Sequence, residues 1–494
     1  MLDSLFTGFQ LALQPHLLLI NLLAVLGGFA IGALPGLTAT MGVAVLAPLT
    51  FKLPPDEGFI ILIAIFVSAV QGGSISAILI NTPGTPAAAA TVFDGYPLAQ
   101  KSQAGKAIGI AQIASFGGLL ISSFFLITCS PLIAHFALKF STPEYFAVAV
   151  FGLTIIGSLS TRSPLKGLLA GLFGLLIATI GLDPLDGIPR FTFGSDYFLG
   201  GISYVPALIG LFGIAEVLVN VEQTGLRSPV IQTIRDVLPS WDEAKQCLST
   251  IFGGGIIGTL IGALPGTGAD IAAFVSYGEA KRWSKHPEKF GTGTLEGIAA
   301  PESANNGACG GALIPMLTLG VPGDAVTAII LGMFIIRGLR PGPSLFAEHA
   351  SLVYTLFAGF LISSVITLTV GLTSARLFAR VLNLPKRYLP PVIFALCIVG
   401  SYAIQSSIFD VYLAVFFGIL GFFMRKLDFH GSPIVLALIL GPMAEYNFRL
   451  SLISSRGDYS IFFSRPISLG FLILAVISAG FPFWREYRAK RKRG

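Results

Sequence analysis

Small polar side chains gather around four short interruptions of otherwise apolar sequence. The interruptions are Pro35-Gly36, Asn81 to Pro86, Pro265 to Gly268 and Gly320 to Asp324. Proline and glycine stop a helix, so each interruption leaves backbone N–H and C=O groups without helical partners. At membrane depth such backbone is tolerated only where it is buried in protein or lines a water-filled cavity. The interruptions therefore predict a binding site inside a membrane-embedded bundle.

Hydroxyl, amide and glycine donors at these breaks are suited to binding an anion. A helix that begins at a break presents free N–H groups and the positive end of its dipole, and both attract carboxylates. Neutral donors also allow a multiply charged anion to be released again. The candidate substrate ligands are Thr38, Thr40, Ser74, Asn81, Thr82, Gly84, Thr85, Thr267, Gly268, Ser303, Asn305, Asn306 and Gly323. The helix-breaking residues are Pro35, Gly36, Pro83, Pro265, Gly266 and Pro322.

Three carboxylates near the same breaks are candidates for binding a cation or carrying a proton: Asp270, Glu302 and Asp324. Acidic side chains within membrane segments are costly and are usually functional. Unwound backbone carbonyls would suit Na⁺ at the same places. For a residue that begins a helix the alternative is a capping role, and for paired glycines it is close helix packing. No cofactor is expected, no metal-ligand spacing links the four cysteines, and none of the five histidines is expected to be a ligand.

The elements that would position these residues are membrane helices. Hydrophobic residues make up 54% of the 494 residues and charged residues only 11%, against about 25% in soluble domains. Hydropathy predicts apolar segments at 16–34, 36–50, 59–93, 104–128, 143–160, 164–182, 205–221, 249–264, 267–280, 298–338, 347–375, 391–407, 410–424, 432–446 and 466–484. At about 1.5 Å per residue, segments 36–50 and 267–280 cannot cross a core of ~30 Å. We expect each to form a re-entrant hairpin with the segment before it.

The distribution of Lys and Arg orients the chain with its C-terminus in the cytoplasm. The basic tail 485–494 is typical of a cytoplasmic flank rather than of a nucleic-acid contact, and the basic loop 281–289 falls on the same side. The amphipathic stretch 229–246 is expected to lie along that face of the lipid bilayer. The acidic loop that contains Asp183, Asp186 and Asp196 falls outside. One loop disagrees, because three arginines also fall outside: Arg449, Arg456 and Arg465.

The two halves of the chain share landmarks in the same order. The pentapeptide Gly-Ala-Leu-Pro-Gly occurs at 32–36 and again at 262–266, an offset of 230, and Pro83-Gly84 recurs as Pro322-Gly323, an offset of 239. Such recurrence indicates a duplication. An odd number of crossings between the copies would invert the second, so we expect inverted-topology repeats. The predicted division is a first transmembrane repeat at 1–221, a cytoplasmic amphipathic linker at 222–248, a second transmembrane repeat at 249–484 and a basic cytoplasmic tail at 485–494.

Missing motifs argue against enzymes and ATP-driven pumps. No phosphate-binding loop is present, because Lys106 follows Gly105 but precedes Ala107 instead of a hydroxyl residue. An intramembrane aspartyl protease would place an aspartate directly after Gly-x-Gly, whereas Ala269 follows Gly268. Ser74 has no helix-borne histidine partner in the sequence, which weakens a serine protease hypothesis. A protein that binds and moves a solute remains the favoured class.

Four motifs resemble the large membrane subunit of the tripartite tricarboxylate transporters, the TctA family. They are Gly32 to Ala39, Gln71 to Pro86, Gly262 to Asp270 and Pro301 to Asn306, and the likeness runs through nearly the whole chain. The resemblance implies secondary uptake of a carboxylate across the bacterial inner membrane, driven by a Na⁺ or H⁺ gradient. It also implies two partners, a small four-span membrane subunit (TctB-like) and a periplasmic solute-binding protein (TctC-like).

Together these observations predict an all-α polytopic membrane protein with two inverted repeats, re-entrant hairpins and broken helices that cradle a di- or tricarboxylate. Alternating access by an elevator-like shift of the block that carries the hairpin tips is expected by fold analogy. The alternatives are an anion-selective channel and a non-transporting membrane anchor or receptor for a periplasmic binding protein. For a carrier, we expect alanine at Asn81 or Asn306 to abolish transport while the protein still inserts.

Overall fold

The computed structural model describes residues 2–159, 164–222, 234, 237–381 and 389–491. Within these ranges the chain is almost entirely helical, with one short hairpin in which β1 (Gly181–Leu182) pairs antiparallel with β2 (Pro189–Arg190). Six helical segments of the described chain are long and apolar enough to cross a bilayer: Pro15–Ala33, Pro55–Ile80, Val92–Ala137, Tyr204–Glu222, Ala350–Arg380 and Ile408–Lys426. The prediction of an all-α, multi-pass membrane protein is confirmed.

The N-terminal half contains both of its predicted breaks. Its elements are α1 (Leu2–Ala12), α2 (Pro15–Ala33), α3 (Ala39–Thr50), α4 (Pro55–Ile80), η1 (Pro86–Ala88), α5 (Val92–Leu98), η2 (Ala99–Gln103), α6 (Ala104–Ala137), α7 (Thr142–Leu159), α8 (Pro164–Ala178), η3 (Asp196–Phe198), α9 (Tyr204–Leu208), η4 (Ile209–Ile214) and α10 (Ala215–Glu222). Proline begins α2 and α4, as its fixed φ and missing N–H favour. The chain leaves helix between α2 and α3 and between α4 and η1.

The C-terminal half contains the other two predicted breaks. Its elements are α11 (Trp241–Gly262), α12 (Gly268–Trp283), η5 (Pro287–Lys289), α13 (Leu295–Leu319), α14 (Ala325–Ile336), α15 (Pro343–Glu348), α16 (Ala350–Val381), α17 (Leu389–Gln405), α18 (Ile408–Lys426), α19 (Ser432–Ser454), α20 (Ile461–Ser464) and α21 (Pro466–Arg491). The two breaks lie between α11 and α12 and between α13 and α14. A capping box of Ser240 and Glu243 begins α11. Residues 241–246 therefore form the first turns of α11 and not a separate interfacial helix, while 223–233 and 235–236 of the predicted linker lie outside the described residues.

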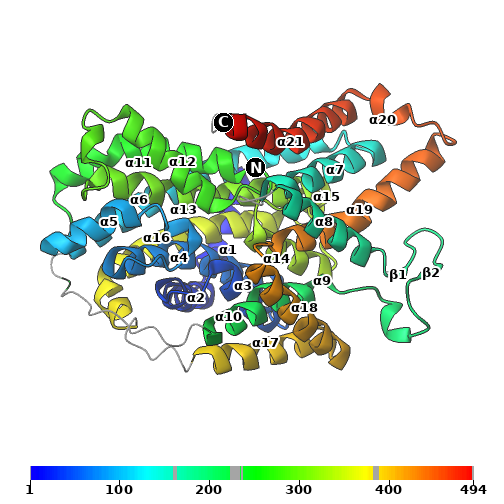
Figure 1. Ribbon diagram of the computed structural model, residues 1–494, viewed down its shortest axis with the longest axis horizontal. Helices are drawn as coiled ribbons and strands as arrows, with labels where there is room; N and C mark the ends of the chain where they lie inside the picture. Colours follow the sequence, from blue (N-terminus) through cyan, green and yellow to red (C-terminus); the bar gives the residue numbers. More distant parts are fainter. Residues whose placement is uncertain (1, 160–163, 223–233, 235–236, 382–388, 492–494) are drawn as a thin grey trace.

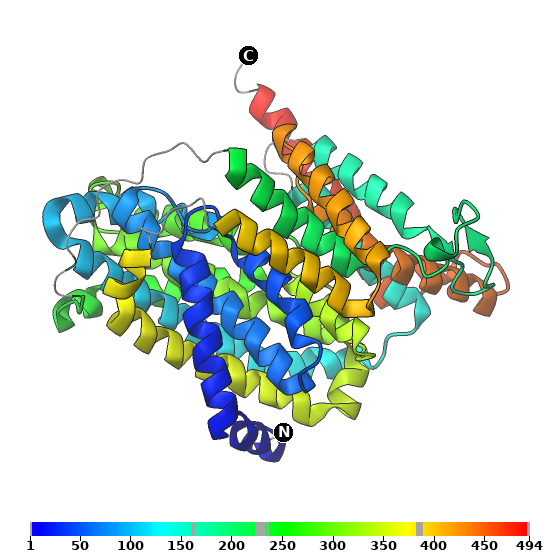
Figure 2. The same cartoon turned by 90° about the horizontal axis from the view of Figure 1, so that it is seen from below.

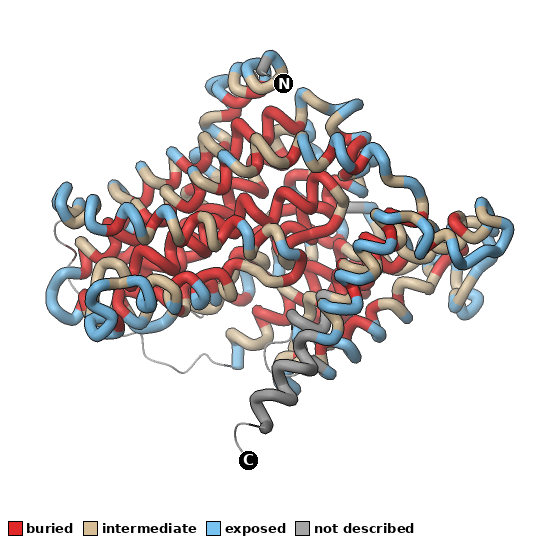
Figure 3. Tube along the Cα trace, turned by 90° about the horizontal axis from the view of Figure 1, so that it is seen from above, coloured by how far each residue is buried: buried red, intermediate tan, exposed pale blue. Residues whose placement is uncertain are grey.

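The helices that follow each hairpin tip are short. α3 has 12 residues and α12 has 16, so they extend over about 18 and 24 Å. By contrast, α4 and α13 run through the centre of the bundle, where Figure 3 shows the densest burial, and 94% of the apolar window of α4 is buried. Figure 1 shows α6, α11, α12 and α13 on one side of the bundle and α7, α19 and α21 on the other. In Figure 2 the C-terminal end of α21 projects beyond the bundle.

Glycines let α2 pack on α4, and α11 on α13, backbone against backbone. A Cβ added at Gly32 would lie 2.1 Å from the carbonyl oxygen of Ala69, and one added at Gly262 would lie 2.4 Å from that of Ala308. Both distances are far below van der Waals contact, so only glycine fits. The two glycines are related by the first sequence offset (262 minus 32), and the two alanines by the second (308 minus 69). The offsets that relate the repeated motifs in the sequence therefore also relate the residues that form these two helix contacts.

The two broken helices end in the same way. α4 ends at Asn81, whose φ of 55° is left-handed, and α13 ends at Gly320 with φ of 70°. Left-handed residues commonly end helices, and asparagine and glycine adopt that conformation at the least cost. The two positions are related by the same offset as the alanines above (320 minus 81). The sequence predicts Asn81 as a ligand at a break inside the apolar segment 59–93, and the structure exposes it at this helix end.

Two of the three arginines that the sequence places on the unexpected side of the membrane form ion pairs with acidic side chains. Arg449 forms ion pairs with Asp183 and Asp186, and Nε of Arg465 lies 2.5 Å from Oε1 of Glu144. Arg449 therefore lies at the same end of the bundle as the acidic loop between α8 and α9. Each of these two arginines pairs with an acidic side chain. Their position is therefore compatible with the predicted position of the acidic loop.

Candidate functional site

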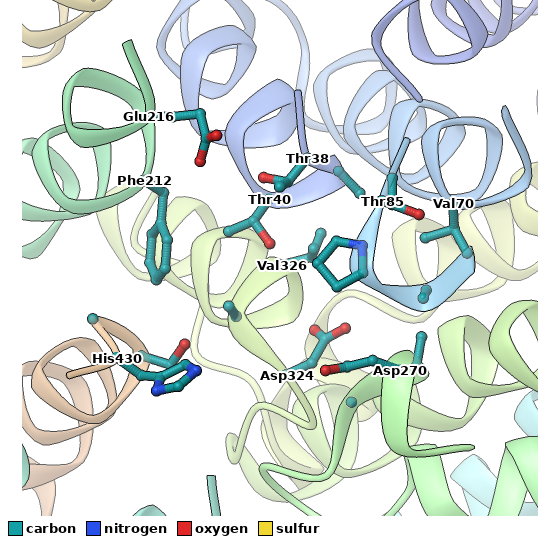
Figure 4. Close-up of a pocket in the computed structure, with 18 of the residues that line it drawn as sticks. Thr38, Thr40, Val70, Thr85, Phe212, Glu216, Asp270, Asp324, Val326 and His430 are labelled. Carbon is teal, nitrogen blue, oxygen red and sulfur yellow. The ribbon is translucent and has the colours of Figure 1, made fainter. Parts of the chain in front are cut away.

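One cavity of about 760 Å³ brings the breaks of both halves together. All four interruptions contribute residues to its wall, although they are spread over more than half of the sequence. From the predicted set, the wall contains Gly36, Thr38, Thr40, Pro83, Gly84, Thr85, Gly266, Thr267, Gly268, Asp270 and Asp324. We call this space the central cavity. Figure 4 shows side chains from several helices pointing into it.

The hydroxyl wall of the central cavity comes from the first half. Oγ1 of Thr38 caps α3 by accepting the N–H of Met41 at 3.1 Å, and Thr40 follows in the first turn. Thr85 is 3% exposed, and its Oγ1 has no hydrogen-bond partner among the residues that the structure describes. That hydroxyl lies against α4, because a Cβ added at Gly73 would come within 2.5 Å of it. This wall is therefore neutral, and it contains the N-terminus of a helix.

The opposite, acidic wall comes from the second half. Asp324 begins α14, and its Oδ1 accepts the N–H of Thr327 at 2.8 Å. Asp270 lies in the first turn of α12 and interacts electrostatically with Asp324. Figure 4 shows the two carboxyl groups next to each other in the cavity. Among the described residues, neither aspartate forms an ion pair with a lysine or arginine. Two acidic groups from different helices thus share one region.

Sequence reasoning missed the third wall, which comes from η4, α10, the C-terminal end of α18 and the α18–α19 connection. Figure 4 shows Phe212, Glu216 and His430 at this wall, and Arg425 also lines it. Arg425 forms an ion pair with Glu216. The signal for Glu216 was an acidic residue within the apolar segment 205–221, whereas Arg425 looked like an ordinary loop charge. His430 also lines the cavity, and the expectation that no histidine is a ligand stays a prediction.

Other predicted residues lie outside the cavity wall. Asn81 and Thr82 are exposed, and the Thr82 hydroxyl donates a hydrogen bond of 3.3 Å to the Ile80 carbonyl. Ser74 donates to the Gln71 carbonyl at 2.7 Å, and Ser303 to the Ile251 carbonyl at 2.6 Å. These hydroxyls bind to backbone within the protein. The remaining predicted residues outside the wall are Glu302, Asn305, Asn306 and Gly323, with the prolines Pro35, Pro265 and Pro322.

Glu302, Asn305 and Asn306 form a buried network directly behind the cavity wall. Glu302 is 0% exposed, and its carboxyl oxygens accept hydrogen bonds from Thr91 at 2.5 Å and Ser115 at 3.1 Å. The Asn305 side chain donates to the carbonyl of Ala87 at 3.1 Å, and Ala87 itself lines the cavity. The Asn306 side chain donates to Oδ1 of Asn305 at 2.7 Å. The network therefore supports the wall from α13.

Comparison with known proteins assigns the chain to a family. A family model described as "Tripartite tricarboxylate transporter TctA family" matches residues 18–436. The chain is 37% identical over 493 residues, all of this chain and 98% of the relative, to the Agrobacterium vitis "Uncharacterized 52.8 kDa protein in TAR-I ttuC' 3'region". It is also 37% identical over 234 residues, 47% of this chain and 97% of the relative, to the "Uncharacterized protein in TAR-II ttuC' 3'region" of Agrobacterium vitis. The chain therefore belongs to the tripartite tricarboxylate transporter TctA family, a family of transporters and not of enzymes.

Proposed function

We propose that the protein is the large permease subunit of a binding-protein-dependent secondary transporter that imports di- or tricarboxylates. The observation that carries this proposal is the central cavity, in which helix breaks from both halves meet. Its volume of about 760 Å³ falls within the usual range for small-molecule sites, roughly 300–1,000 Å³. Secondary transporters bind substrate and coupling ion at such breaks.

The two halves supply different chemistry at matching positions. At the first sequence offset (270 minus 40), Thr40 of the first hairpin corresponds to Asp270 of the second. At the second offset (324 minus 85), Thr85 corresponds to Asp324. A carboxylate ion would be attracted by hydroxyls and by the N-terminus of α3, but repelled by two aspartates. The substrate anion therefore binds on the hydroxyl wall.

The coupling cation binds on the acidic wall, at Asp270 and Asp324. The cavity wall contains four acidic side chains (Glu216, Asp270, Asp324 and Asp428) and two basic ones (Arg425 and His430). An anionic substrate would therefore enter a cavity with excess negative charge unless a Na⁺ or H⁺ came with it. This charge balance couples the two ligands, because each lowers the cost of binding the other. Glu302 lies behind the wall and is the less direct candidate.

Transport requires the cavity to open alternately to the two sides of the membrane. The matched contacts of Gly32 and Gly262 support two repeats, and the inversion follows from the odd number of crossings that the sequence predicts between them. A second observation is that α6, from the first half, packs on α11 and α13, whereas α16, from the second half, packs on α2 and α4. We infer an elevator-like shift of the block that carries the breaks. The C-terminus faces the cytoplasm of the bacterial inner membrane, and the four-span and periplasmic subunits complete the transporter.

The test is uptake of labelled citrate, succinate or other carboxylates into proteoliposomes that contain the chain with its two partner subunits. Saturable accumulation that requires an imposed Na⁺ or H⁺ gradient is expected. A carrier should also show faster uptake when unlabelled substrate is present inside, whereas a channel should not. Absence of gradient-dependent uptake for every carboxylate would reject the proposal. Normal uptake in a Thr40→Asp, Thr85→Asp double variant would reject the hydroxyl wall as the anion site.

A further inference from the structure

A second cavity of about 580 Å³ lies between α11 and α12, apart from the central cavity. Its inner part runs between glycines of α11, Gly253 and Gly254, and small residues of α12, Ser276 and Ala280. Its outer part lies under the loop that follows α12. Figure 1 shows the two helices next to each other at one edge of the bundle, where lipid would surround them in a membrane. The space therefore has an intramembrane end and an end at the aqueous loop.

The loop end of this cavity is basic and contains a tryptophan. Trp283 is 67% exposed, and Lys285, His286 and Lys289 follow it in the wall. Among the described residues, neither lysine forms an ion pair with an acidic side chain, whereas His286 contacts Glu288 at 3.2 Å. The one carboxylate in the wall, Glu296, accepts a hydrogen bond from Ser284 at 2.8 Å. The lysines thus give this end a net positive charge.

The loop that carries these lysines is fixed in place from behind. Asp94 is 0% exposed, and its Oδ1 accepts backbone N–H groups of Gly293 at 2.7 Å and Thr294 at 2.9 Å. Its other oxygen accepts the hydroxyl of Tyr277 on α12 at 2.9 Å. Lys101 donates to the Thr292 carbonyl at 2.7 Å. Binding to an ordered loop costs less conformational entropy than binding to a mobile loop.

We propose that this cavity binds one anionic phospholipid of the surrounding bilayer. The phosphate group would contact Lys285 and Lys289, and one acyl chain would enter the space beside Gly253. Tryptophan is favoured at the membrane interface, where Trp283 would lie at the depth of the headgroup. Basic pockets between transmembrane helices hold anionic headgroups in this way. The exposed Leu248 and Phe252 on α11 continue the apolar surface toward the lipid.

The proposal is tested by measuring which lipids stay bound to the purified chain. The protein is equilibrated with equal amounts of phosphatidylglycerol and phosphatidylcholine, washed in detergent and weighed by native mass spectrometry. Wild type is expected to retain one phosphatidylglycerol in preference to phosphatidylcholine. The K285Q/K289Q double variant should bind phosphatidylglycerol roughly thirtyfold more weakly, because each lysine near the surface adds about a factor of five. Equal retention of both lipids by wild type would overturn the proposal.

Two further variants separate a specific site from general attraction. K281Q/R282Q removes the same charge from exposed residues in the last turn of α12, next to the loop but outside the cavity, so it should keep the retained lipid. G253L fills the acyl space and leaves every charge in place, so it should lose the lipid. Equal loss in K281Q/R282Q and K285Q/K289Q would contradict the site. Displacement of the lipid by millimolar glycerol phosphate or inorganic phosphate would also contradict it, because the pocket would then bind a free anion.

Discussion

The backbone N–H of Gly266 donates a hydrogen bond of 2.7 Å to the carbonyl oxygen of Gly323. This bond joins the tip between α11 and α12 to the break between α13 and α14, so the two acidic residues beyond them, Asp270 and Asp324, are held together. In the first half the tip is held differently, because the Asn220 side chain on α10 donates to the Gly36 carbonyl at 3.0 Å. The second half thus presents its breaks as one connected unit.

Removing the acidic groups of that unit should affect ion coupling more strongly than it affects substrate binding. In Asp270→Asn and Asp324→Asn we expect the concentration of Na⁺ or H⁺ needed for half-maximal uptake to change by about tenfold or more, equivalent to ~1.4 kcal/mol of lost cation binding. Substrate exchange without a gradient should survive. Asp410→Asn is the control, because Asp410 is a buried aspartate that is likewise near a helix start but lies outside the cavity wall. Unchanged ion dependence in both test variants would remove the aspartates from the coupling site.

The close approach of α2 to α4 predicts a strong effect of a single methyl group. Gly32→Ala places its Cβ against the Ala69 carbonyl, and Gly262→Ala does the same against Ala308. Each should lower the free energy of unfolding by about 1–3 kcal/mol, seen as a lower melting temperature in detergent. Gly27→Ala on the same helix α2 is the control, since no described atom outside its own stretch of helix backbone and its chain neighbours lies within 4 Å of the added Cβ. Equal melting temperatures for G27A and G32A would contradict the packing.

Asn81 should respond to substitution as a helix end and not as a ligand. Asn81→Gly keeps the left-handed conformation and should leave melting temperature and uptake near wild type. Asn81→Ala should destabilise the protein by about 1–2 kcal/mol, because an alanine Cβ is strained at positive φ. If N81G abolished uptake of a well-folded protein, the amide itself would be needed for transport.

The network behind the hydroxyl wall should affect substrate binding by fixing the position of the cavity wall. Asn305→Ala removes the hydrogen bond to the buried Ala87 carbonyl, at a cost of about 1–3 kcal/mol for an unsatisfied buried group. We expect a raised KM for carboxylate uptake with a smaller change in maximal rate, since Ala87 is part of the wall. Ser303→Ala, whose hydroxyl bonds to Ile251 on α11, should not raise KM. The same KM in N305A and S303A would argue against this support.

The acidic loop predicts a specific loss of stability in acid. Backbone N–H groups of Asp186 and Leu185, and then Arg449, lower the pKa of Asp183 from 3.8 to about 2. A lowered folded pKa means that the ionised carboxylate stabilises the fold fully above pH 3.8, and that this contribution disappears as pH falls toward 2. Melting temperatures of wild type and Asp183→Asn should therefore differ above about pH 4 and converge near pH 2. A constant difference down to pH 2 would contradict this assignment.

The sequence by itself determined the local structure of the breaks. Pro35-Gly36 and Pro265-Gly266 stop their helices because proline lacks a donor and glycine accepts positive φ, with values of 91° at Gly36 and 83° at Gly266. Apolar composition determined the membrane-spanning class, and the shortness of 36–50 and 267–280 followed from counting residues. These properties depend on a few neighbouring residues, which is why sequence reasoning reached them.

Only the tertiary structure decided which polar residues share the central cavity. Thr40 and Asp324 meet there because α3 and α14 are packed together, although the two residues belong to opposite halves of the chain. The same packing brings Glu216 and His430 to the wall and turns Glu302 and Asn306 into a network behind it. In an apolar sequence almost every helix face can pack against another helix, so hydrophobic periodicity does not specify partners. The close contacts of particular glycines do specify the partners, but these contacts exist only after the helices have packed together.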